Sequence, residues 1–220
     1  MAAAHDNGLR PMNFDEPFRA GLRDLLTWRR DVRRFRADPL PQGTLERLIG
    51  MACLAPSVGL SQPWRFVIVD DPVRRRAVIA DFKACNADAL ATYSDEAAAR
   101  YAGLKLAGLE EAPGQMAVYA DRDTEAGHGL GRRTMPEMAD YSAVAAIHTM
   151  WLAARAEGIG MGWVSILDPA RVSRILEVPG RWRFIGYFCF GTPQAEDDRP
   201  ELQRAGWESR RTPDDFILRR

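Results

Sequence analysis

The sequence is poor in the residues that bind metals or cross-link a chain. Its 220 residues include three cysteines and three histidines, and both kinds are widely scattered. No CxxC pair, HExxH motif or cluster of carboxylates and histidines at ligand spacing is present, so the sequence predicts no metal site. Three widely spaced cysteines are typical of reduced thiols, which predicts a cytoplasmic protein.

The sequence also lacks an excess of charge and any long apolar run. Lys plus Arg and Asp plus Glu each total 30, which leaves a formal net charge of zero. We therefore expect no overall attraction to nucleic acid or to a membrane surface. No run approaches the roughly 18 apolar residues of a membrane span. Residues 1–13 lack the apolar core of a signal peptide and are expected to form a flexible N-terminal arm.

Motifs of two common enzyme classes are missing as well. The glycine-rich residues 127–131 have no predicted helix directly after them, and residues 158–162 precede a strand instead of following one. A dinucleotide fingerprint needs strand, glycines and helix in that order, so neither segment predicts a Rossmann site. A serine-hydrolase elbow of the Gly-x-Ser-x-Gly type is also absent.

Hydrophobic periodicity predicts alternating helices and strands in one domain over residues 14–220, an α/β or α+β layer fold. With 46% hydrophobic residues, the chain can bury one sizeable core. Asp71 and Asp168, each followed by proline, are typical helix N-caps. Helices are expected at 15–29, 43–54, 73–111 with a break near Ser94, 138–157 and 169–176. Strands are expected at 64–69, 116–120, 163–166 and 184–190, with a long loop over 122–136.

Two segments of the chain are expected to need a partner surface. The helix at 138–157 carries small and apolar residues on more than one face, which favours burial in the domain or against a second chain. The last 30 residues are polar and end in an apolar, strand-like anchor at 216–218. Together they predict a homodimer. We interpret residues 84–111 as a lid.

The most unusual segment is residues 28–35, in which four arginines and one aspartate lie between two aromatic residues. Pro39 and Pro41 follow closely and argue against a continuing helix. Guanidinium groups bind phosphate through planar, paired donors, so the segment is a candidate phosphate clamp. From these residues alone, a solvated charged turn remains the alternative.

Two further segments offer polar groups next to strands. Residues 57–64 join a helix to a buried strand and carry hydroxyls, an amide and a glycine, which could hydrogen-bond a heterocycle. An ordinary helix-to-strand connection fits the spacing equally well. Ser165 ends an apolar strand, where a serine is usually structural, but Gly162 before it would let a flat ligand approach the backbone.

Taken together, these segments resemble the nitroreductase-like flavoprotein superfamily, from about Arg29 to the C-terminal tail. Within it they closely resemble the 5,6-dimethylbenzimidazole synthases, or flavin destructases. Several separated motifs carry the resemblance in the same order: RRDVR (29–33), APSVG (55–59), QPW (62–64), WLAARAEG (151–158) and GWVS (162–165).

The resemblance implies an α+β homodimer with a central mixed, mainly antiparallel sheet flanked by helices. It implies a lid at about 84–111, a C-terminal extension at about 192–220 exchanged between subunits, and FMN at the subunit interface. The implied activity is the O₂-dependent fragmentation of reduced FMN to 5,6-dimethylbenzimidazole and erythrose 4-phosphate, which serves the lower ligand of vitamin B12 (cobalamin biosynthesis). A separate flavin reductase would supply the reduced FMN.

The resemblance also implies roles for individual residues. Asp31 would be the catalytic carboxylate, and Ser165 would assist the reaction with oxygen. Arg211, two residues before Pro213, matches a tail arginine near the phosphate, but one extra residue in the spacing from Trp207 leaves Arg210 as the alternative. Arg29, Arg30 and Arg33 would hold the phosphate and flank the ring. The remaining FMN-binding positions implied are Val32, Ser57, Gln62 and Lys105.

Physical chemistry is consistent with these implied roles. The FMN phosphate carries nearly two negative charges, which several arginines can offset. Asp31 among arginines should stay ionised and could accept a proton, which arginine cannot. Two other functions remain open. One is an NAD(P)H-dependent FMN nitroreductase, and the other is a flavin-binding carrier without catalysis, which would not need Asp31.

Overall fold

The computed structural model describes residues 13–220, so the arm predicted over residues 1–13 lies outside the described residues except for Asn13. All three pairings of the central sheet are antiparallel. The mixed sheet that we expected is therefore wrong for these strands, and the one parallel pairing in the part described is the isolated bridge between Asp31 and Met161. The strands lie in the order β1 (Trp64–Ile68), β2 (Gly114–Asp121), β4 (Trp182–Gly191) and β3 (Gly160–Val164).

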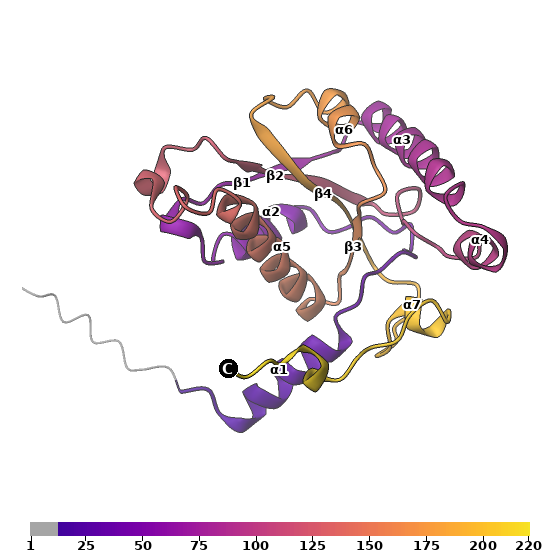
Figure 1. Cartoon of the computed structure of the whole chain (residues 1–220), viewed down its shortest axis with the longest axis horizontal. Helices are drawn as coiled ribbons and strands as arrows, with labels where there is room; N and C mark the ends of the chain where they lie inside the picture. The colour runs from indigo at the N-terminus through magenta and orange to yellow at the C-terminus, as the bar shows by residue number, and fades with distance from the viewer. Residues whose placement is uncertain (1–12) are drawn as a thin grey trace, which may run out of the picture.

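Helices cover both faces of this sheet, which makes the fold α+β (Figure 1). The two faces carry different helices and separate cores. α2 (Thr44–Ala52) and α5 (Met138–Ala156) pack on one face, and α3 (Pro72–Leu90) and α6 (Pro169–Ile175) pack on the other.

Strand β2 explains why two cores form. Its alternate side chains point to opposite faces, as the pleat of a strand requires. Met116 and Val118 enter the core beneath α5, whereas Ala117 and Tyr119 enter the core beneath α3. The whole strand is buried, so it forms the centre of the domain.

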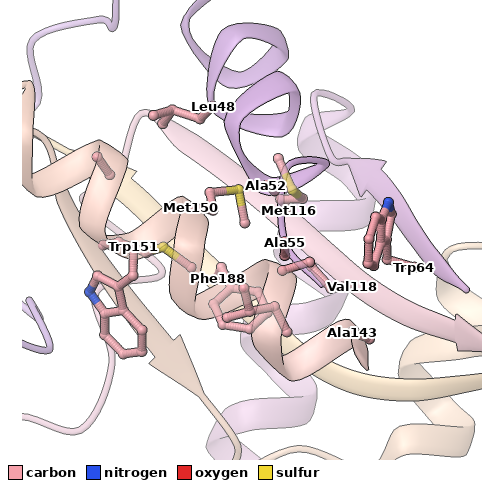
Figure 2. Close-up of a cluster of buried hydrophobic side chains, with 14 of the residues drawn as sticks. Leu48, Ala52, Ala55, Trp64, Met116, Val118, Ala143, Met150, Trp151 and Phe188 are labelled. Atoms are coloured by element: carbon pink, nitrogen blue, oxygen red, sulfur yellow. The ribbon is translucent and has the colours of Figure 1, made fainter. Parts of the chain in front are cut away.

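Helix α5 is the central helix that the sequence predicted. Its bounds agree with the expected 138–157 to within one residue. Buried alanines such as Ala143 and Ala154 let it approach the sheet closely, and Met150 fills the space near Phe188 and Met116 (Figure 2). The helix therefore gives the rest of the chain a rigid support.

The Asp-Pro signals for helix starts are confirmed. The Asp71 carboxylate accepts a hydrogen bond from the Val73 N–H at 2.7 Å, at the start of α3. The Asp168 carboxylate accepts from the Ala170 and Arg171 N–H groups at the start of α6. Each side chain satisfies backbone donors that a helix start leaves free.

The expected helix over 73–111 needs correction at its C-terminal end. The break near Ser94 is confirmed, because α3 is followed by a separate α4 (Asp95–Ala102). Residues 103–113, however, contain no helix. Instead they form turns and irregular chain, in which Gly108 packs closely: a Cβ atom at this position would lie 2.4 Å from the Phe35 ring. The segment lies flat against the core instead of coiling over it.

The two ends of the described chain lie outside the layers of the sheet and its covering helices (Figure 1). α1 (Glu16–Trp28) has no buried residue and contacts mainly α5. The tail contains α7 (Glu201–Arg204) and a short 3-10 turn, η3 (Pro213–Phe216). The strand-like anchor expected at 216–218 is therefore wrong in this chain, because Phe216 belongs to η3 and the next two residues are irregular and exposed.

Within residues 13–220, no helix has both the length and the apolar character needed to cross a membrane. The same residues contain no group of three or more His, Cys, Asp or Glu side chains placed to hold a metal ion. All three cysteines are free thiols.

Candidate functional site

The arginine segment, residues 29–33, lies along the open edge of β3. The Val32 N–H donates to the Met161 carbonyl at 3.0 Å, and the Trp163 N–H donates to Asp31 Oδ1 at 2.8 Å. Gly162 makes this approach feasible, because a Cβ atom there would lie 2.1 Å from the Val32 carbonyl oxygen. The Asp31 side chain thus takes the place of a strand partner for an edge N–H group.

The C-terminal half of α5 holds the same segment from another side. The Trp151 indole N–H donates to the Arg30 carbonyl at 3.1 Å. The Arg29 guanidinium lies over the Trp151 ring at 4.9 Å, in cation–π contact. The segment is therefore an anchored, half-buried stretch, which argues against the solvated turn that its sequence alone left open.

A cleft of about 220 Å³ beside this segment concentrates positive charge. Among the described residues, no carboxylate forms a salt bridge with Arg29, Arg30 or Arg210. We call it the Arg210 cleft, and its lining consists of Arg29, Arg30, Asp31, Arg33, Pro200, Glu201, Leu202 and Arg210.

Burial and mutual repulsion lower the pKa values of Arg29 and Arg30, although nearby carboxylates, Asp31 for Arg29 and Asp197 and Asp198 for Arg30, act in the opposite direction. The repulsion on Arg29 comes from Arg210, and that on Arg30 comes from Arg29 and Arg210. Arg30 Nε is buried without a hydrogen-bond partner in the described part of the chain. Like charges gathered beside an unsatisfied donor fit a dianionic ligand such as a phosphate.

A second cleft, of about 450 Å³, shares Arg30, Asp31 and Arg33 with the first. Its other arginines are already paired with carboxylates. Arg34 forms a salt bridge with Glu201, and Arg204 pairs with Asp197 at 3.2 Å. Because these charges are balanced, the Arg210 cleft is the stronger candidate for an anion site.

Asp31 is both anchored and open to the clefts. Arg33 donates to Asp31 Oδ2 from Nε at 2.9 Å and contacts it from Nη2 at 2.8 Å. Together with the bond from Trp163, these contacts fix both carboxylate oxygens. The Asp31 side chain is still 29% exposed, and it lines both clefts. Such a carboxylate can exchange a proton with a molecule bound in the cleft.

Ser165 and the two tail arginines differ in how they relate to the clefts. Ser165 is exposed directly after the last residue of β3, but it lines neither cleft. Arg210 lines the Arg210 cleft, whereas Arg211 does not.

Ser57 and Gln62 lie elsewhere in this chain. The Gln62 N–H donates to Ser57 Oγ at 3.1 Å, and the loop is tied to the start of α5 by the Val58 N–H and Ser142 Oγ at 3.0 Å. Ser142 and Trp151 are about 13 Å apart along the helix at its usual rise per residue. Neither Ser57 nor Gln62 lines either cleft. One chain therefore does not bring them to the arginine segment.

Lys105 also differs from its expected place. Its ammonium pairs with Glu111 at 2.6 Å and lines neither cleft. Its backbone carbonyl, however, accepts a hydrogen bond from Arg33 Nη1 at 3.1 Å. No sequence motif marks this carbonyl or the Trp163 N–H as part of the site, because every residue carries the same backbone groups. For Trp151 the sequence does offer a signal, because a single tryptophan in an alanine-rich helix is a candidate for contact with a neighbouring segment.

The glycine-rich segment 127–131 has a packing role. A Cβ atom at Gly127 would lie 2.4 Å from the Gly59 carbonyl oxygen, so the two loops touch through their backbones. In the facing loop, Leu60 and Gln62 adopt left-handed conformations at φ of 53° and 43°. Residues held in that region are strained by about 1–3 kcal/mol and are typical of functional loops.

Comparison with known proteins identifies the family to which this chain belongs. The model of the nitroreductase family matches residues 26–192. The chain belongs to the nitroreductase family. This nitroreductase-family chain is 58% identical to the 5,6-dimethylbenzimidazole synthase of Rhodospirillum rubrum, over 90% of this chain and 94% of that protein. It is 49% identical to the protein of the same name from Rhodobacter capsulatus, over 90% and 95%.

A solved structure shows the same fold. The crystal structure of oxidized iodotyrosine deiodinase bound to FMN and 3-iodo-L-tyrosine matches with a TM-score of 0.68 at 22% identity. The match covers 80% of this chain and 91% of that one. At this level of identity it supports the fold alone.

Proposed function

We propose that this chain catalyses the O₂-dependent fragmentation of reduced FMN to 5,6-dimethylbenzimidazole and erythrose 4-phosphate, for the lower ligand of vitamin B12. The identity to two proteins named 5,6-dimethylbenzimidazole synthase supports this reaction. The structural observation that carries it is an anchored carboxylate, Asp31, which lines a cleft together with three arginines that form no salt bridge in the described part of the chain. A reusable cofactor would need the arginines but not the carboxylate.

The proposed reaction uses reduced FMN as the substrate and O₂ as the oxidant. The benzimidazole keeps the dimethyl ring, two nitrogens and one carbon of the ribityl chain. The other four ribityl carbons leave with the phosphate as erythrose 4-phosphate. The pyrimidine ring of the isoalloxazine, with four carbons and two nitrogens, leaves as a third fragment that takes up the two atoms of O₂. A separate flavin reductase in the cytoplasm supplies the reduced FMN, because the chain itself is proposed to consume it.

The residues of the Arg210 cleft, together with Ser165 at the end of β3, have separate roles in the proposed reaction. Arg29, Arg30 and Arg210 hold the phosphate through charge-assisted hydrogen bonds. Asp31 accepts or returns a proton near the ribityl chain while Trp163 and Arg33 hold its orientation. Ser165 offers a hydroxyl and a backbone N–H where negative charge develops on oxygen. Val32 lies between these groups and contributes backbone to the ligand site.

The reaction can be tested with the purified protein and reduced FMN. The flavin is reduced without oxygen, mixed with the protein and exposed to air, and the products are separated by chromatography with mass detection. We expect 5,6-dimethylbenzimidazole in proportion to the FMN consumed. Recovery of intact FMN would contradict the proposal: with NAD(P)H oxidation it would indicate a nitroreductase, and without it a flavin carrier.

We also propose that the site is completed by a second copy of the chain. Ser57, Gln62 and Lys105 belong to the proposed ligand site but line neither cleft of a single chain. Large apolar side chains are left exposed outside the layers of the domain. In α1 and just before it these are Phe14, Phe18, Leu22, Leu26 and Trp28, and at the tail Phe216, Ile217 and Leu218.

A homodimer with an interface above about 2,000 Å² is the expected assembly, in the size class of obligate dimers. Light scattering at micromolar concentration should give a mass near twice the 24.6 kDa of one chain. A variant with Phe18 and Leu22 both changed to serine should shift the mass toward the monomer, because it removes apolar area from the exposed face of α1. A monomeric wild-type protein would contradict the assembly and the shared site.

A further inference from the structure

We infer that Arg33 is a positioning residue, one that couples closure of the lid (residues 84–111) to the orientation of Asp31. The resemblance implies that Arg33 binds the phosphate, but its contacts indicate a different task. The inference rests on the proposed function, because its consequence is a change in the fate of reduced FMN.

The Arg33 guanidinium is already occupied. Nε and Nη2 face Asp31 Oδ2, and Nη1 donates to the Lys105 carbonyl. The side chain is only 14% exposed, compared with 29% for Asp31. A planar guanidinium can bond a carboxylate through two nitrogens and still reach a carbonyl with the third, whereas an ammonium makes all its hydrogen bonds from one nitrogen and lacks this fixed spacing. Little of the guanidinium remains for a phosphate, in contrast to Arg29, Arg30 and Arg210.

The base of the lid packs against the same segment that carries Asp31. Gly108 faces the Phe35 ring and the Arg33 carbonyl, where an added Cβ atom would lie 2.4 Å and 3.1 Å away. Phe35 itself is buried. The lid base therefore rests directly on residues 33–35, and a lift of the lid would withdraw the Lys105 carbonyl from Arg33.

The far part of the lid is held by the tail. Trp207 meets the rings of Tyr93 and Tyr101 edge-on, with centroid distances of 5.9 Å and 6.2 Å. Tyr101 also donates from its hydroxyl to Asn86 Oδ1 at 2.8 Å. The lid is thus held by aromatic contacts at its tip and by the hydrogen bond to Arg33 at its base. Because Arg33 also bonds Asp31, the position of the lid affects the orientation of Asp31.

This arrangement predicts how Arg33 acts in turnover. With the bridge intact, Asp31 keeps its orientation and reduced FMN is fragmented. Without it, O₂ takes two electrons and two protons from reduced FMN, giving oxidised FMN and hydrogen peroxide. Loss of Arg33 should therefore change the ratio of benzimidazole to peroxide and leave phosphate recognition unchanged.

The experiment compares Arg33→Ala with Arg36→Ala, which removes a charge from the same segment at an exposed position. For each protein, the affinities for FMN and riboflavin are measured, together with benzimidazole and peroxide formed per reduced FMN oxidised. For Arg33→Ala we expect about 10-fold or more loss of benzimidazole per FMN oxidised. Peroxide should rise to match, and the FMN-to-riboflavin affinity ratio should stay as in the wild type. Arg36→Ala should match the wild type in both.

Two additions keep the test decisive. Millimolar guanidinium should restore part of the benzimidazole yield of Arg33→Ala, which a merely misfolded variant would not show. Arg33→Lys keeps the charge but lacks the paired Nε and Nη2 donors that orient Asp31, so it should also favour peroxide. A normal product ratio with a reduced preference for FMN over riboflavin would overturn the inference and return Arg33 to the phosphate. Absence of benzimidazole from the wild type would instead contradict the proposed function.

Discussion

Replacing Asp31 by asparagine is expected to lower benzimidazole formation by about 10²-fold or more, the usual scale for loss of a general base. The change removes the charge and basicity of the side chain but nearly preserves its size. FMN should still bind, because Arg29, Arg30 and Arg210 are unchanged. Reduced FMN would then be reoxidised by O₂ and recovered intact.

The contacts of Asp31 indicate how the asparagine variant would behave structurally. The amide oxygen can still accept from the Trp163 N–H, but the amide nitrogen would then face the donors of Arg33. The resulting mismatch should cost about 1–3 kcal/mol of stability. The measurement is therefore benzimidazole formed per bound FMN, so that a partly unfolded population does not count as lost catalysis.

Asp121→Asn is a matched control for this prediction. Asp121 is paired with an arginine as Asp31 is, at 3.0 Å from Arg65, but it is buried and lines neither cleft. This variant should lose stability and keep its yield per bound FMN. If Asp31→Asn likewise kept a near wild-type yield per bound FMN, Asp31 would be a structural partner of Arg33 and the proton-transfer role would be wrong.

The second large effect concerns the phosphate. Arg29→Ala should weaken FMN binding by about 10- to 100-fold, because a hydrogen bond to a charged group contributes roughly 1.5–3 kcal/mol. Riboflavin has no phosphate, so its affinity should fall much less. A small loss common to both ligands is expected, since Arg29 also packs over Trp151. Titration of both flavins by fluorescence quenching gives the two affinities.

The tail arginines provide an internal comparison for the same measurement. Arg210 lines the Arg210 cleft and lowers the pKa of both Arg29 and Arg30, whereas Arg211 does not line it. Arg210→Ala should therefore resemble Arg29→Ala, and Arg211→Ala should bind both flavins normally. Equal losses for FMN and riboflavin in Arg29→Ala and Arg210→Ala would show that the cleft does not hold the phosphate.

Much of the fold was predictable because its signals are local. The apolar faces of α5 and the buried run of β2 follow from periodicity over one element. The Asp-Pro starts of α3 and α6 depend on hydrogen bonds within a few residues. The separated motifs also identified the family and the arginine segment. These features require no knowledge of what lies far away in the chain.

The geometry of the candidate site was decided only by the tertiary structure. Asp31 meets the Trp163 N–H across 132 positions of sequence, and Arg33 meets the Lys105 carbonyl across 72. The place of Arg210 in the cleft and the packing of Gly108 against Phe35 also depend on residues far away in the chain. Backbone groups are the same in every residue, so a sequence cannot mark which of them a side chain will reach. The sequence determined which charged groups are available. Packing decided which of them form ion pairs and which stay free to bind a ligand.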